Sequence, residues 1–173
     1  YAYGYHVINK KRSCPIGNVT MWKKDMFQCV NIELTSCAVF TSLIYKKTAL
    51  KFLLSNIHLR AGLQSHEDDR VNQIKSLIKK FDGVETGIMC GDFNDTLYEK
   101  SKVLHQLIRF KKSPAYVTCI VCDGDHDPNL FPFDHIFSIG LNIKVWPCPE
   151  PKSIPTKDEP SDHYSRVFDI LIN

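Results

Sequence analysis

Acidic, amide and imidazole side chains recur at four places in this sequence, each beside a run of apolar or β-branched residues. The four clusters are Asn56-Ile57-His58, Asp92-Phe93-Asn94, Asp134-His135 and Asp162-His163. In the second cluster the acid and the amide alternate, so both project to the same side of an extended chain. Carboxylates bind hard metal ions and accept protons, and imidazoles hold anions or carry protons. These residue types suit metal-assisted hydrolysis of a phosphoester, provided that the fold brings the clusters together.

Each cluster alone also has a plain structural interpretation. A single histidine at a strand end, such as His58, usually lies at the surface or serves a local hydrogen bond. Gly91-Asp92 could form an ordinary turn, because glycine and aspartate are common turn residues. Ser161-Asp162 could cap a helix or form an Asx turn. Taken singly, these structural interpretations are favoured, but the four clusters together, in this order along one chain, favour a functional site.

Short strands are predicted to position the clusters. From about residue 69 to 81, Val71, Ile74 and Leu77 recur at helical spacing, and Ser65 with Asp68 resembles a capping box before them. A second, weaker helix is predicted over 97–110, and the first eighteen residues show no clear period. Because the strands mostly follow one another directly, the pattern predicts an α+β fold with antiparallel sheets. The predicted strands cover residues 18–22, 26–34, 38–45, 49–56, 86–90, 116–121, 133–138, 142–146 and 166–172.

The composition is that of a globular protein, with 43% hydrophobic residues and a net charge of +3. No apolar run reaches about 18 residues, so no membrane span is expected, and residues 1–12 lack the apolar centre of a signal peptide. The seven cysteines lie mostly in apolar runs, which predicts free thiols in an intracellular protein, cytoplasmic or nuclear. Cys119 and Cys122 could be half of a zinc knuckle or a redox pair. No second pair follows, so buried strand cysteines are favoured there.

The order of the motifs resembles the endonuclease/exonuclease/phosphatase superfamily, and within it the group of carbon-catabolite-repressor-type deadenylases, nocturnin and the angel proteins. The likeness extends from about Gly17 to the C-terminus. It implies a deoxyribonuclease-like four-layer α/β sandwich, that is, a two-layer β-sandwich with helices packed outside. Residues 1–173 would be the C-terminal half of this single domain. The motifs are Asn-x-His-Leu (56–59), Arg-x-x-Gln (Arg70, Gln73), Gly-Asp-Phe-Asn (91–94), Asp-His-Ile-Phe (134–137) and Ser-Asp-His (161–163).

The resemblance also implies roles for the acids and the imidazoles. Asp92 would orient or deprotonate the attacking water, and Asn94 would hold a phosphate oxygen or the metal. His163 would touch the scissile phosphate, with Asp134 holding its other ring nitrogen. A carboxylate behind an imidazole fixes its tautomer and favours its charged form.

The resemblance implies that the remaining site residues would contact the metal or the substrate. Asp162 would face the metal, and Asn56 and His58 would contact the substrate. The metal-binding set Asp92, Asn94 and Asp162 supplies carboxylate and amide oxygens, which fit Mg²⁺, with Mn²⁺ as a substitute, better than zinc.

The implied activity is magnesium-dependent phosphodiester hydrolysis, by a 3′ exoribonuclease on single-stranded RNA. Basic residues at 10–12 and 109–112 are candidate contacts to the strand. The same chemistry on DNA, a 2′-linked oligoadenylate, or a lipid or inositol phosphate is one alternative. A non-catalytic binding module is another.

The sequence departs from the family pattern in ways that bear on activity. In the family, the first half of the domain carries a strand that ends in Gln-Glu, and this glutamate is the main metal ligand. This sequence contains no such strand and no Gln-Glu pair. Glu33 has no glutamine before it and is predicted to lie at the surface. The 173 residues alone are therefore expected to be inactive, with a missing half or a partner segment covering the exposed sheet. His135 stands where many relatives carry tyrosine.

The acidic run at 123–129 has the alternating carboxylates of a calcium-binding loop, but Pro128 stands where such a loop needs glycine. An ordinary surface loop is therefore expected there.

Overall fold

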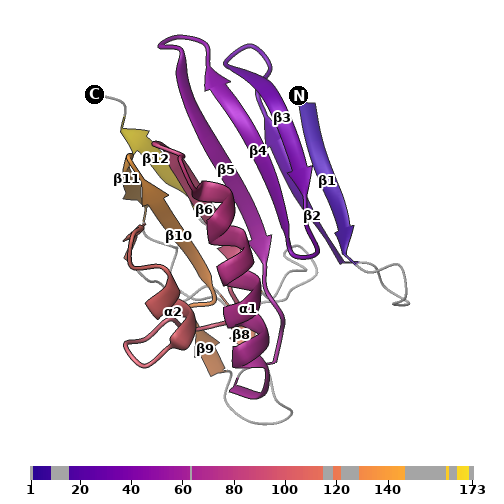
Figure 1. Cartoon of the computed structure of the whole chain (residues 1–173), viewed down its shortest axis with the longest axis vertical. Helices are drawn as coiled ribbons and strands as arrows, with labels where there is room; N and C mark the ends of the chain where they lie inside the picture. The colour runs from indigo at the N-terminus through magenta and orange to yellow at the C-terminus, as the bar shows by residue number, and fades with distance from the viewer. Residues whose placement is uncertain are drawn as a thin grey trace.

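A computed structural model describes residues 2–8, 16–62, 64–114, 119–121, 129–146, 163 and 167–171 (Figure 1). Strands outnumber helices, and the predicted α+β class is confirmed. The strands are β1 Ala2–Ile8, β2 Ile16–Trp22, β3 Phe27–Leu34, β4 Ala38–Tyr45, β5 Leu50–His58, β6 Gly87–Asp92, β7 Lys111–Lys112, β8 Cys119–Val121, β9 Asn129–Phe131, β10 Asp134–Ile139, β11 Asn142–Val145 and β12 Phe168–Leu171. The helices are α1 Glu67–Ile78 and α2 Lys102–Gln106, with single 3₁₀ turns η1 Gln64–His66 and η2 Lys79–Phe81.

The main sheet has the strand order β3-β4-β5-β6-β10-β7. Strands β5 and β6 run parallel, joined by the crossover helix α1, and every other pair in this sheet is antiparallel. Because β10 runs against β6, the ends of β5 and β6 meet the start of β10 at one edge. Three short two-stranded sheets, β1-β2, β8-β9 and β11-β12, accompany the main sheet.

The helices cover one face of the main sheet, as Figure 1 shows for α1 and α2. The inward side of α1 carries Val71, Ile74 and Leu77, all buried in one cluster with the sheet residues Phe40 and Phe137. Burying an aliphatic or aromatic side chain of this size contributes about 1.5–3 kcal/mol. The main hydrophobic core of the described residues thus lies between the helices and this face of the sheet. It holds α1 against β4, β5, β6 and β10.

The hairpin β1-β2 packs on the opposite face of the sheet and corrects one prediction. Residues 1–18 were expected to be irregular, but β1 pairs with β2 from Ala2 opposite Trp22 to Ile8 opposite Ile16. Trp22 buries itself with Leu43 and Phe52 in a second, smaller cluster. The strand forms because a partner lies alongside it, and such a partner leaves no period in the sequence of β1 itself.

The helix boundaries also differ from the predictions. Helix α1 begins at Glu67, and the residue before it, His66, makes no capping hydrogen bond, so the predicted capping box at Ser65 is wrong. Three acids in the first turn complement the helix dipole instead. Helix α2 is shorter than predicted because Leu97 adopts a positive φ of 51° and Ser101 caps the helix by accepting a hydrogen bond from Leu104 N.

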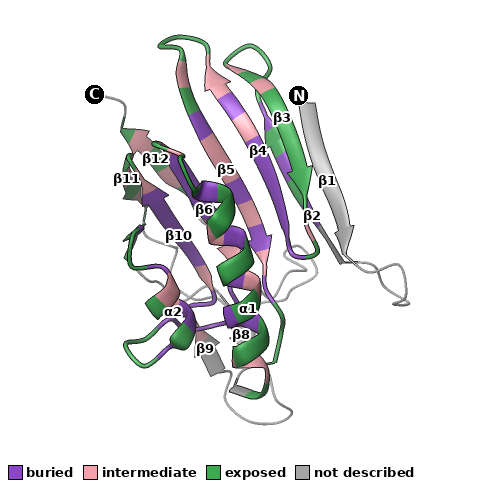
Figure 2. Ribbon diagram, viewed as in Figure 1, coloured by how far each residue is buried: buried purple, intermediate pink, exposed green. Residues whose placement is uncertain are grey.

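The outer strand β3 is an edge of the main sheet and is largely exposed. Figure 2 shows β3 largely exposed beside the buried residues of β4 and β5. Val30, Ile32 and Leu34 on this strand keep 60%, 39% and 46% of their surface exposed. Glu33 is exposed as predicted and forms an ion pair with Lys80. An open edge strand can pair with another chain, and a segment that covers it remains a prediction.

Three cysteines with described side chains, Cys29, Cys37 and Cys90, are free thiols. Burial, with a smaller effect from the Asp134 carboxylate, raises the pKa of Cys90 to about 12. This thiol therefore stays protonated and is a poor nucleophile. The side chains of the Cys119 and Cys122 pair and the acidic run at 123–128 lie outside the described residues. Among the described helices, none is long and apolar enough to cross a membrane.

Candidate functional site

Three of the candidate residues stand directly opposite one another at one edge of the main sheet. His58 is the last residue of β5, Asp92 the last of β6 and Asp134 the first of β10. Asp92 is the register partner of both His58 and Asp134. Side chains of opposed residues on neighbouring strands lie about 5 Å apart on the same face. The strand order therefore brings together three residues that lie up to 76 positions apart in the sequence (58 to 134).

These three side chains and His163 form an acid–imidazole cluster. His58 Nε2 lies 3.6 Å from Asp92 Oδ2, and His163 Nε2 lies 4.0 Å from the same oxygen. On the other side of its ring, His163 Nδ1 lies 2.7 Å from Asp134 Oδ2. The four side chains are between 17% and 28% exposed. The cluster is therefore held firmly within the fold and yet open to a ligand from solvent.

Asn94 fixes the carboxylate of Asp92 through a tight turn. The backbone N–H of Asn94 donates to Asp92 Oδ1 at 2.7 Å, and its side-chain amide donates to Asp92 Oδ2 at 3.0 Å. The same amide nitrogen lies 3.0 Å from the carbonyl oxygen of Leu59. Asn94 adopts φ 48°, a left-handed conformation that asparagine tolerates better than most residues. Both carboxylate oxygens of Asp92 are thus held in place by one residue two positions later.

Burial raises the pKa of the Asp92 carboxyl, and the neighbouring Asp134 carboxylate raises it further. The Asn94 N–H, His58 and His163 lower the pKa, but less strongly, so the net shift is upward. A carboxylate with a raised pKa is a stronger base than a free aspartate. Asp92 is consequently the residue in this cluster best suited to accept a proton from water.

The same shift predicts how the metal-free protein responds to pH. Unfolded Asp92 titrates near its ordinary pKa of about 4, and folding raises that value. Stabilisation by the protonated group is therefore complete below pH about 4 and is lost as the pH rises through the folded-state pKa. With a chelator present at pH 7, Asp92→Asn should unfold a few degrees above the wild type, and the gap should close toward pH 4. Thermal unfolding followed by circular dichroism measures both, and a less stable variant at pH 7 would contradict the prediction.

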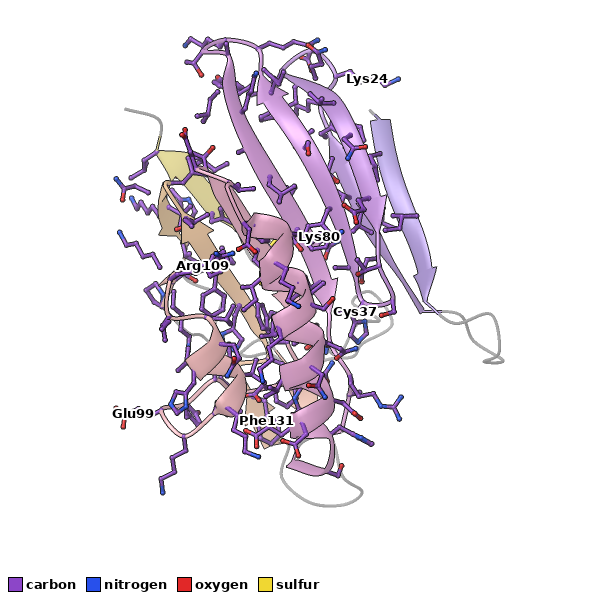
Figure 3. All side chains as sticks on the ribbon, viewed as in Figure 1. Lys24, Cys37, Lys80, Glu99, Arg109 and Phe131 are labelled. Carbon is purple, nitrogen blue, oxygen red and sulfur yellow. The ribbon has the colours of Figure 1, made fainter. Side chains whose placement is uncertain are left out.

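Asn56 lies on the same face as His58, two residues earlier on β5, but its amide has a packing role. Its side-chain nitrogen donates to the carbonyl oxygen of Val19 on β2 at 2.8 Å. The backbone carbonyl oxygen of Asn56 accepts a hydrogen bond from the side-chain amide of Asn18 at 3.2 Å. Asn18 also bonds to the carbonyl oxygen of Cys37, labelled in Figure 3, which in turn accepts the backbone N–H of His58. The contacts of Asn56 thus anchor the β1-β2 hairpin beside the cluster, and Asp162, the remaining candidate, lies outside the described residues.

Sequence reasoning missed two features beside the cluster. One is Asn18, for which no sequence signal was available because its partners are backbone carbonyls of distant strands. The other is the buried ion pair between Arg70 and Asp95, with Arg70 Nε 3.6 Å from Asp95 Oδ2. A signal for Arg70 did exist, since it lies four residues before Ile74 on the apolar side of the predicted helix. His135 is also buried and points away from the cluster, toward Asp95 O at 2.9 Å.

The oxygen-rich side of the cluster fits a divalent cation only in part. The Asp134 carboxylate raises the energy of the charged form of the neighbouring Asp92, and a cation between the two would relieve that repulsion. The amide of Asn94 adds a neutral oxygen donor. Across the residues that the structure describes, however, no three His, Cys, Asp or Glu side chains are placed to hold a metal ion. A divalent cation here would need waters and further ligands to complete its coordination, as is usual for Mg²⁺.

A groove of about 540 Å³ lies elsewhere, on the helical face near the distal ends of β3, β4 and β5. Phe40, Lys51 and Lys80 are among the residues that line it, and none of the candidate residues does. The acid–imidazole cluster, and not this groove, is the candidate site, because it holds the groups that proton transfer and metal binding need.

Comparison with solved structures shows what fold these elements form. The human nocturnin catalytic domain with a bound sulfate anion matches 98% of this chain and 72% of its own, with a TM-score of 0.68 and 18% identity. D. rerio TDP2 complexed with a single-strand DNA product matches 96% and 77%, with a TM-score of 0.69 and 13% identity. An endonuclease/exonuclease/phosphatase family protein from Bacteroides thetaiotaomicron matches 99% and 76%, with a TM-score of 0.67 and 16% identity. No family model and no curated protein matches the sequence. The chain thus has the fold of these proteins, and the resemblance noted in its motifs is confirmed at the level of the fold.

Proposed function

We propose that this protein is a divalent-metal-dependent phosphodiesterase, and more specifically a 3′ exonuclease on single-stranded RNA. The observation that carries the proposal is the acid–imidazole cluster. One carboxylate, Asp92, faces the Nε2 atoms of two imidazoles, and a second carboxylate, Asp134, holds the far nitrogen of one of them. The fold and the order of the motifs point to the same chemistry.

In this proposal the residues divide the reaction between them. Asp92 orients the attacking water and accepts its proton as the new P–O bond forms and the bond to the leaving oxygen breaks. The leaving oxygen takes a proton from solvent and becomes the 3′-hydroxyl of the shortened strand. His163 and His58 present Nε2 to the phosphoryl oxygens, which carry the developing negative charge. Asp92 and Asn94, with Asp162, would hold Mg²⁺ or Mn²⁺, which supplies Lewis-acid stabilisation of the phosphoryl group. A further carboxylate from outside these 173 residues is proposed to complete the metal ligands.

A panel of substrates tests the proposal. The full protein, with Mg²⁺ and separately with Mn²⁺, is incubated with a 5′-labelled oligoadenylate, the matching DNA strand, a 2′-linked oligoadenylate and an inositol phosphate. Stepwise shortening of the RNA from its 3′ end with release of 5′-nucleotides is expected. If no member of the panel is cleaved with either metal, the protein acts as a binding module and the proposal is wrong.

Another phosphoester is the second candidate, because one structure of the same fold, that of D. rerio TDP2, was determined with a single-strand DNA product. Preferential cleavage of the DNA strand, or of a non-nucleotide phosphoester, would keep the chemistry and change the substrate. In the basic segment at Arg109 to Lys112, Arg109 pairs with Asp82 and Lys112 donates to the carbonyl oxygen of Leu97, so the segment gives little support to a nucleic-acid path.

Asp134→Asn should lower kcat by about 10²–10⁴-fold. Asp134 Oδ2 accepts the Nδ1–H of His163 at 2.7 Å, and its negative charge stabilises a ring protonated on both nitrogens, whose Nε2–H can donate to a phosphoryl oxygen. An amide at position 134 lacks this negative charge, so it supports the doubly protonated ring less well. Single-turnover kinetics measures the loss, and Asp169→Asn, which changes an exposed aspartate bonded to Trp146, is the matched control. Equal rates for Asp134→Asn and the control would contradict the assigned role.

A further inference from the structure

Arg70 is a buried cation on α1 whose contacts reach two different loops. The residue is 2% exposed, and a buried guanidinium is rare unless acceptors surround it. Nη1 donates to the carbonyl oxygens of Arg60 at 3.2 Å and Gly62 at 3.0 Å, in the loop after β5. Nε lies 3.6 Å from Asp95 Oδ2, in the loop after β6. One turn later, Gln73 accepts the backbone N–H of Arg60 at 2.9 Å, so α1 holds the first loop at two points.

Asp95 ties the second loop to the rest of the fold. It is 8% exposed, and its Oδ1 accepts the backbone N–H of Leu97 at 2.8 Å. Its carbonyl oxygen lies 2.9 Å from Nε2 of the buried His135 on β10. With the guanidinium of Arg70 on its other carboxylate oxygen, Asp95 joins α1, β10 and its own loop. A residue held from three sides has little freedom to move, and neither has the residue before it.

The two loops that Arg70 joins are those that carry the candidate site. The first follows His58 directly, and the second contains Asn94, whose turn holds Asp92. Leu59 N donates to Asp92 O at 2.9 Å, and the Asn94 side chain donates to Leu59 O at 3.0 Å. These bonds link the loops on the side of the cluster. Arg70 links the same loops from the side of the helix.

We propose that Arg70 and Asp95 form a positioning pair that sets the separation of His58 from Asp92 and Asn94. The inference rests on the proposed function, because it gives the pair a role in the same site. Neither residue is among the groups that would meet the phosphate, so both act through the loops they hold. The forked guanidinium can serve a carboxylate and two carbonyls at once. A lysine ammonium keeps the charge but loses this fork.

The test compares Arg70→Lys with Lys80→Arg in the full protein. Lys80, labelled in Figure 3, pairs with Glu33 just beyond the other end of α1, so its replacement controls for the exchange of a basic side chain beside this helix. Arg70→Lys should lower kcat by about 10- to 100-fold, as expected for a small displacement of reacting groups. KM should change by less than about threefold, and Lys80→Arg should leave both constants near the wild type. A merely structural role would lower the thermal midpoint and leave kcat of the folded fraction intact.

A second measurement separates this inference from the proposed function. Nuclear magnetic resonance of the ring nitrogens of His58 and the side-chain amide of Asn94 reports on the site whether or not a substrate is cleaved. These resonances should shift in Arg70→Lys and stay in place in Lys80→Arg. If the wild type cleaves no phosphoester, the resonances alone decide, and unchanged resonances would overturn the positioning role. If Arg70→Lys does not fold, Asp95→Asn, which keeps the acceptor for Leu97 N, carries the same measurements and the same criteria.

Discussion

Asp92→Asn is expected to lower phosphodiester hydrolysis by roughly 10³-fold, within the range lost when a general base is removed. The amide oxygen can still accept the backbone N–H of Asn94, so the turn can persist. The basic Oδ2, which faces His58 and His163 and accepts the Asn94 side-chain amide, is lost. Rates are measured under single-turnover conditions on the substrate that the panel identifies, with saturating Mg²⁺. The same substitution is expected to stabilise the metal-free fold at neutral pH. Opposite signs for activity and stability are what a residue kept for chemistry should show.

Asp25→Asn is the matched control for this experiment. Asp25 is exposed in the turn between β2 and β3, far from the cluster in sequence. Its replacement by asparagine removes one negative charge, as Asp92→Asn does. Its variant should retain the wild-type rate within about twofold, in keeping with the small effects of surface substitutions. An Asp92→Asn protein that keeps more than a tenth of the wild-type rate would show that Asp92 is not the base.

Gly91→Ala is expected to destabilise the fold by about 4 kcal/mol or more, the range reserved for severe steric conflict. Gly91 has φ 131°, and a Cβ built on it would lie 2.1 Å from Ile57 O and 2.9 Å from Ile57 N. Both atoms belong to the backbone of β5, directly paired with β6 at this position, so no side-chain rotation can relieve the contact. Urea unfolding followed by circular dichroism gives the free energy. The strand next to Asp92 must move or the protein must unfold.

Gly83→Ala separates this clash from the general cost of a positive φ. Gly83 has φ 74°, and a Cβ there would meet nothing within 4 Å. Its variant should lose only about 1–2 kcal/mol, the cost of a left-handed conformation with a Cβ. Similar losses in the two variants would mean that backbone conformation alone, and not the approach of β5, makes glycine necessary at position 91.

The sequence by itself predicted those parts of the protein that depend on local pattern. Alternating and apolar runs predicted β4, β5, β6 and β10, and the spacing of Val71, Ile74 and Leu77 predicted α1. The motif order also indicated the fold and named the residues that the structure places in one cluster. These predictions succeed because side-chain period and turn chemistry are properties of neighbours in sequence.

The tertiary structure alone decided which partners those residues meet. Residues 2–8 form a strand because β2 lies alongside them. The side-chain amide of Asn56 donates a hydrogen bond to Val19 on the β1-β2 hairpin. Arg70 pairs with Asp95, 25 positions away in the sequence (70 to 95), behind the site.

The tertiary structure also brings together the four side chains of the cluster, His58, Asp92, Asp134 and His163, at one edge of the sheet. Their meeting depends on the strand order and on the parallel register of β5 and β6. If the register of β6 against β5 were shifted by one residue, Asp92 would point to the helical face. Register is set by contacts between distant segments, and no local pattern encodes it.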